Sequence, residues 1–242
     1  MTISEMHTAF KLGLDKVESL QYPSFLTEEI DFWLNQAIRK FVKTRYSGMN
    51  IKQEGFEQSQ KRIDDLRTLV REVTVPCSAG VAGVNKPNSY VLTSGFGNVV
   101  FTTDPYWLSL GEEVTISYTS TQPIAGVVTP KRVGVVDITS DSYRFEKEDP
   151  LSEHILHYDE AKPLRLFYNN TIEFITDGTY SITEAYVRYI KQPKTVIYAT
   201  AISCDLAEHA HEEIVNMAVQ LVLENIEQPR LQSYSQAIDT ME

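Results

Sequence analysis

The spacing of apolar residues changes twice along the chain, and this constrains the fold more than any other feature. Apolar residues recur every three to four positions in the first ~70 residues and the last ~35, which is the helical period, whereas the middle has strand spacing. The sequence predicts an α+β fold, in which N-terminal and C-terminal helices form a helical bundle beside an antiparallel β-rich middle domain, sandwich or barrel-like. The expected parts are residues 1–73 (helical), 74–203 (β-rich) and 204–242 (a C-terminal helix and extended arm packing with the N-terminal helices).

The clearest predicted helix lies in FLTEEIDFWLNQAIRKFVKTRYSG, whose apolar residues share one face. Thr27 can cap its start and Gly48 ends it. Further helices are expected over about residues 3–20 and 57–70. In CDLAEHAHEEIVNMAVQLVLENIE the pattern predicts a core helix, and Asp205 followed by Glu208 has the spacing of a capping box.

After residue 73, glycine, proline, serine and asparagine interrupt short β-rich runs. The segment LRLFYNNTIEFITDGTYSITEAYVRYIK predicts three antiparallel strands joined by tight turns at Asn169-Asn170 and Asp177-Gly178, since these residues accept positive φ. The polar stretch 147–162 is expected to be a long surface connection. Earlier strands are expected at 90–93, 99–102, 114–119 and 132–138.

The histidines His209 and His211 are candidates for a metal site, but their spacing argues against it. A helical zinc motif places histidines four apart so that both face one metal, whereas residues two apart point to different sides. The chain also lacks G-x-S-x-G, P-loop and G-x-G-x-x-G motifs. We therefore expect no enzyme, no cofactor and no metal. Residues that could supply a carboxylate pair, or simply reflect an acidic composition, are Asp137, Asp141, Glu146, Glu148 and Asp149.

The net charge is -11, from 33 acidic and 22 basic residues, which argues against general binding to a nucleic-acid backbone. An acidic wall can still let DNA slide past without sticking. Neither a membrane-spanning apolar run nor a signal-peptide pattern is present, so we expect no membrane association and a chain that stays in the cytosol that makes it. Cys77 and Cys204 receive no role.

Candidate interface residues lie in two places. The aromatic pair in TTDPYWLSLGEE is either an exposed interface anchor or a loop folded onto the sheet. The polar stretch PRLQSYSQAIDTME is either an arm that orders on a partner or a fraying end. The interface candidates are Tyr106, Trp107, Pro229, Arg230, Leu231 and Tyr234.

Two segments, FLTEEIDFWLNQAIRKFVKTRYSG and CDLAEHAHEEIVNMAVQLVLENIEQPRLQSY, resemble the head-tail connector (ring or adaptor) proteins of crAss-like and related tailed bacteriophages. The resemblance implies a non-enzymatic structural virion protein, made in the host cytoplasm and located in the neck or tail. Copies would form a homo-oligomeric ring, expected to be a dodecamer, that docks below the portal protein, contacts neighbouring ring proteins and joins capsid to tail. Genomic DNA would pass through its channel during ejection without specific binding.

Two other interpretations remain open. The chain is alternatively another tail or baseplate component with a β-rich module that binds protein or carbohydrate, which the tyrosine-rich strands and the Tyr106-Trp107 pair motivate. It is otherwise a hydrolase that uses the acidic cluster or the histidines.

Overall fold

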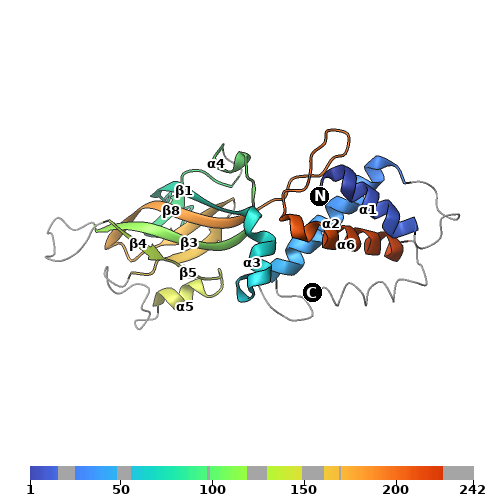
Figure 1. The fold of residues 1–242 in the computed structure, drawn as a ribbon. Coiled ribbons are helices and arrows are strands. Elements are labelled where there is room, and N and C mark those ends of the chain that lie inside the picture. The colour runs from blue at the N-terminus through green and yellow to red at the C-terminus, as the bar shows by residue number, and fades with distance from the viewer. Residues whose placement is uncertain are drawn as a thin grey trace. The chain divides into compact units, whose positions relative to one another are not determined.

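The computed structural model describes residues 1–15, 25–47, 56–96, 99–118, 130–148, 161–168 and 170–225. The chain divides into two compact units (Figure 1). We call Met1–Val70 together with the chain from Pro193 onward the helical unit, and Arg71–Gln192 the sheet unit. The predicted α+β class, with helices toward both termini, is confirmed.

In the helical unit, α6 (His211–Asn225) packs against both α1 (Ile3–Asp15) and α2 (Thr27–Ser47). The side of α2 that is buried repeats every three to four residues, as the sequence predicts. Segment 193–203 groups with these helices because the Asn35 side chain on α2 bonds both the backbone N–H and C=O of Val196, each at 2.9 Å. The buried residues of α2 are Ile30, Leu34, Ala37, Ile38, Phe41, Val42 and Arg45.

Two local predictions in this unit are wrong. The continuous helix expected over 57–70 is three short pieces, η1 (Phe56–Gln58), α3 (Gln60–Leu66) and η2 (Arg67–Leu69), and Val70 already opens a strand. Asp205 is not the N-cap residue that the predicted capping box requires, because Ala207 occupies that position. The Asp205 Oδ1 atom accepts a hydrogen bond from the Lys194 N–H at 3.3 Å. A 3-10 turn, η4 (Glu208–Ala210), leads into α6 without a side-chain cap.

The sheet unit contains one eight-stranded sheet of order β4-β3-β8-β1-β2-β7-β6-β5. Strands β5 and β6 are parallel, which corrects the expectation of a purely antiparallel domain. The antiparallel pairs are β1–β2, β2–β7, β3–β4, β3–β8 and β6–β7. The strands are β1 (Val70–Ala79), β2 (Ser89–Leu92), β3 (Tyr106–Tyr118), β4 (Lys131–Gly134), β5 (Val136–Asp137), β6 (Leu164–Tyr168), β7 (Thr171–Ile175) and β8 (Tyr180–Lys191).

The sheet curls until its two edges nearly meet. The edge strands β4 and β5 stand at opposite ends of the strand order, yet only Val135 separates them in the chain. Two peptide units span no more than about 7.6 Å, so the ends of the two edge strands must lie close together. The sheet is therefore barrel-like and nearly closed, which selects the barrel alternative over the sandwich.

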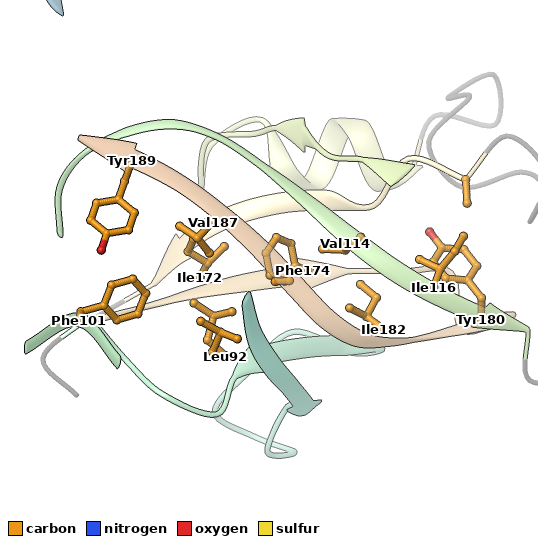
Figure 2. Close-up of a cluster of buried hydrophobic side chains, with 13 residues drawn as sticks. Leu92, Phe101, Val114, Ile116, Ile172, Phe174, Tyr180, Ile182, Val187 and Tyr189 are labelled. Carbon is orange, nitrogen blue, oxygen red and sulfur yellow. The ribbon is translucent and has the colours of Figure 1, made fainter. Parts of the chain in front are cut away.

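Apolar side chains from β2, β3, β7 and β8 point into the interior of this curled sheet (Figure 2). Along β8 the residues of the interior apolar cluster are Tyr180 and Ile182, then Ala185, Val187 and Tyr189. The change from even to odd numbers occurs at a bulge, since Thr115 pairs with Glu184 while Ile116 pairs with Ile182. The extra residue in β8 keeps the apolar side chains inside while the long strand bends.

The strand predicted over 99–102 is instead a short helix, α4 (Val99–Thr102). The strands on either side of it in sequence offer no free edge, because β2 lies between β1 and β7 and β3 lies between β4 and β8. The helical turn places Phe101, which is buried, against Tyr189 with ring centroids 5.5 Å apart. The strands expected over 90–93 and 114–119 correspond to β2 and the end of β3, and 132–138 divides into β4 and β5.

The structure describes part of the predicted surface connection. Its first residues belong to α5 (Tyr143–Glu148), while 149–160 lie outside the described residues, as does Asn169 of the first predicted turn. Among the residues that the structure describes, no helix is long and apolar enough to cross a membrane.

The hairpin predicted at Asp177-Gly178 is wrong, because this link joins β7 to β8, which are not neighbours in the strand order. The positive φ expected at the link is present at Gly178 and gives a direct test of the fold. Gly178 has φ +92°, and a Cβ there would lie 3.0 Å from the Asn88 Nδ2 atom, so Gly178→Ala should destabilise the sheet unit by about 1–2 kcal/mol. Gly134→Ala is the matched control, because open space surrounds Gly134 and its φ is ordinary. Urea unfolding measures both; equal stabilities of the two variants would contradict this account.

Candidate functional site

The strongest concentration of buried charge in the sheet unit surrounds Arg165 on β6, whose exposure is only 8%. Its guanidinium pairs with Glu112 on β3 and Asp137 on β5, and also donates to the Ser109 Oγ at 3.1 Å. Because β3 and β6 are far apart in the strand order, these contacts cross the gap between the two sheet edges. Arg165 therefore holds the curled sheet together where backbone hydrogen bonds do not close it.

A second buried arginine organises the helical unit. Arg45 on α2, 2% exposed, donates from Nε to Asp65 on α3 at 3.0 Å and also pairs with Glu213 on α6. Burial raises the pKa of the Glu213 carboxyl, and this outweighs the opposing effect of Arg45. One cation thus fastens three helices that come from distant parts of the sequence.

A third cluster joins the two ends of the sheet unit. Asp104 accepts from Lys191 Nζ at 3.0 Å and from Arg71 Nε at 3.1 Å, and its backbone C=O accepts from the Tyr189 hydroxyl at 2.8 Å. Arg71 and Lys191 lie where the chain enters and leaves the unit. The hydrogen bond from Lys191, supported by Arg71, lowers the pKa of the Asp104 carboxyl below its ordinary value.

The two candidate histidines face different partners. His209 Nε2 lies 2.9 Å from Asp65 Oδ1, whereas His211 Nε2 lies 3.1 Å from the Leu206 backbone oxygen. Burial lowers the pKa of His211. Across the described ranges, no group of three or more His, Cys, Asp or Glu side chains is placed to hold a metal ion.

The acidic candidates that the structure describes have different surroundings. Asp137 is engaged by Arg165, Asp141 is exposed, and Asp149 lies outside the described residues. Glu146 and Glu148 both belong to α5. Burial raises the pKa of the Cys77 thiol to about 12 and that of Cys204 to about 11, so both thiols are protonated at neutral pH.

The aromatic interface candidates open β3 rather than lying in a loop. Tyr106 pairs with Lys191 of β8, and its ring stacks on Phe96 with centroids 4.1 Å apart, so its ring contributes to the interior. Trp107 is half-buried, and an interface role for it stays a prediction. The other candidates, Pro229, Arg230, Leu231 and Tyr234, lie outside the described residues.

Periodicity and motifs in the sequence did not predict that Arg45 and Arg165 join distant elements through buried ion pairs. A signal for Arg45 existed, since it continues the buried spacing of Leu34, Ile38 and Phe41 and so falls on the apolar face of its own helix. No comparable signal marks Arg165. Its partners are 53 and 28 positions away in sequence, and only the strand order brings them together.

The fold and these clusters define an α+β protein of two units whose buried ion pairs join elements distant in sequence. Residues 1–230 match the family described as phage tail ring protein 3/4, and the chain therefore belongs to this family. The protein is thus a bacteriophage structural ring protein of the virion, which confirms the resemblance to phage ring and adaptor proteins. No curated protein matches the chain.

Removing the cation at the sheet edges should unfold the sheet unit at lower urea concentration. Arg165→Met leaves Glu112, whose side chain is 1% exposed, without its buried counter-ion, and we expect a loss of about 3–5 kcal/mol. The double variant Glu112→Gln, Arg165→Met should recover part of this loss because no unpaired buried carboxylate remains opposite β6. Urea titrations followed by near-ultraviolet circular dichroism compare them; a double variant no more stable than the single one would contradict the account.

The Asp104 cluster predicts acid sensitivity of the sheet unit. Its carboxyl has a lower pKa in the folded than in the unfolded chain, so its stabilising effect is present above about pH 4 and is lost as pH falls through the lowered value. Asp104→Asn should be less stable at pH 7 and lose less stability between pH 7 and pH 3 than the wild type. Thermal unfolding across this range tests it, with exposed Asp141→Asn as the control. Parallel wild-type and Asp104→Asn curves would be inconsistent with this origin.

Proposed function

We propose that copies of this chain form a closed ring, expected to be a dodecamer, in the neck or tail of the phage particle. In this proposal the ring docks below the portal, directly or through a neighbouring ring, extends the DNA channel and joins capsid to tail. The single observation that carries the proposal is the family match over residues 1–230, which spans both units. In this proposal the terminal helices of each subunit act as a helical bundle.

The charge of the chain supports a passive role toward DNA. With a net charge of -11, a ring would present few sites for the counterion release that drives nonspecific DNA binding. DNA would therefore pass through the channel without being held.

We also propose that the protein acts without catalysis. The buried carboxylates Glu112 and Asp65 are occupied by arginines. Carboxylates paired in this way stabilise the fold. Breaking the pairs to free a carboxylate for catalysis would destabilise the folded protein.

Titration of the purified chain onto portal particles from the same virus tests the docking. Bound copies per portal, counted by native mass spectrometry, should saturate at a fixed ratio that matches the portal symmetry. Since closed rings have a defined copy number, a ratio that keeps rising with concentration would count against a ring.

A parallel measurement compares binding of the purified chain to purified tails with its binding to purified portals. If the chain binds purified tails but not portals, it belongs to a more distal ring or tail component. Absence of the chain from mature particles, measured by quantitative mass spectrometry, would reject a structural role in the virion.

A further inference from the structure

A ring built from identical copies has a physical difficulty, and the inference that follows rests on the ring proposed above. Neighbouring copies in a closed cyclic ring meet through two different surfaces. Every copy carries the same net charge of -11, so copies repel one another at long range. A contact between them forms most favourably where one copy displays cations that its own side chains do not neutralise.

Most described cations are already occupied. In the sheet unit, Arg71, Arg132, Arg165, Arg188 and Lys191 all form ion pairs with carboxylates of the same unit. A different group of described basic side chains has no ion pair, hydrogen bond or aromatic partner in the described part of the chain, and all its members belong to the helical unit. They are Lys11, Arg39, Lys40, Lys43 and Lys194.

Three of these cations share one face of α2. Phe32, Gln36, Arg39 and Lys43 follow one another at intervals of three or four residues, with Lys40 beside them, and all five are exposed. We call these five residues the outer strip of α2. It lies on the side of the helix away from the buried residues that α6 and α1 cover. The helix therefore uses one side for its own fold and leaves the other uncovered.

The outer strip also has an apolar anchor. The Phe32 side chain is 54% exposed and meets the neighbouring Trp33 ring edge-to-face, with centroids 5.3 Å apart. Aromatic residues and arginine are enriched in protein interfaces, whereas isolated lysines are common on any surface. The combination of an exposed aromatic ring with Arg39 is the composition of a contact surface.

These features favour a protein partner over DNA. Glu28 and Glu29 are exposed in the first turn of the same helix, about one turn from Phe32, and their carboxylates would repel phosphates. The exposed Phe32 ring is what favours a protein, since a protein surface can cover an apolar side chain whereas a phosphate backbone cannot. Every copy has 33 acidic against 22 basic residues, so a neighbouring copy offers carboxylates in excess.

We propose that the outer strip of α2 binds an acidic surface of the neighbouring copy in the ring. Phe32 would be the apolar centre of the contact, and Arg39, Lys40 and Lys43 would neutralise the facing carboxylates. The contact would weaken with added salt, because its electrostatic part is formed by exposed charges.

Two matched charge reversals test the proposal in the full-length chain. Lys40→Glu with Lys43→Glu and Lys11→Glu with Lys194→Glu change the net charge equally and both affect unpartnered, exposed cations of the helical unit. The first pair should require at least about tenfold more protein to fill rings on particles that lack the wild-type chain, whereas the second should behave like the wild type. Thermal unfolding checks that both remain folded. Equal defects in the two pairs would overturn the proposal.

A photo-crosslinking amino acid at position 40 identifies the partner directly in assembled particles. Crosslinks to a second copy of this chain support the proposal, and the same probe at position 11 is the control. Crosslinks from position 40 to DNA or to a different virion protein, or no crosslink to a second copy, overturn the proposed α2 contact. These outcomes do not contradict the proposed ring. Absence of the wild-type chain from particles would instead reject the proposed function itself.

Discussion

The sheet unit depends on how its two edge strands are brought together. An open sheet exposes unpaired N–H and C=O groups along both edges, and such edges invite pairing with other chains. Here β4 and β5 are those edges, and a single residue, Val135, connects them. The short link forces the sheet to curl, and the buried pair between Arg165 and Glu112 fixes the curl by joining β6 to β3. Charge and chain connectivity thus replace part of the backbone ladder that a fully closed sheet would have.

The helical unit solves a related problem with the same chemistry. Arg45, Asp65 and Glu213 come from three helices whose positions in the sequence span 168 residues. A buried ion pair adds little net stability compared with apolar packing, but breaking one is costly, so it favours one arrangement of the elements over others. Both units therefore use an arginine that serves two carboxylates to select how distant segments meet.

Features that follow from local residue spacing were predicted correctly from the sequence. Features that depend on pairing with segments distant in the chain were not. The buried face of α2 and the positive φ at Gly178 follow from residue spacing and residue type, whereas the hairpin expected around Gly178 does not form. The run at 99–102 has the composition of a strand, yet it became helical because its neighbours left no open edge. Arg165 lies between Leu164 and Leu166 in a run that looks like any buried strand, and nothing in its neighbourhood reveals Glu112. Strand order, which single-sequence periodicity does not contain, determines these features.

The distribution of cations separates the roles of the two units. In the sheet unit the arginines of β1, β4, β6 and β8 form ion pairs with carboxylates of the same unit. The helical unit neutralises its buried carboxylates with Arg45 and keeps Arg39, Lys40 and Lys43 at the surface. A copy therefore presents a local cationic strip on α2 although its net charge is strongly negative. Identical copies attract where this strip faces carboxylates on a different surface of the next copy, which favours a head-to-tail arrangement over a symmetric pair. Such an arrangement continues from copy to copy, and a ring results when the rotation between successive copies closes.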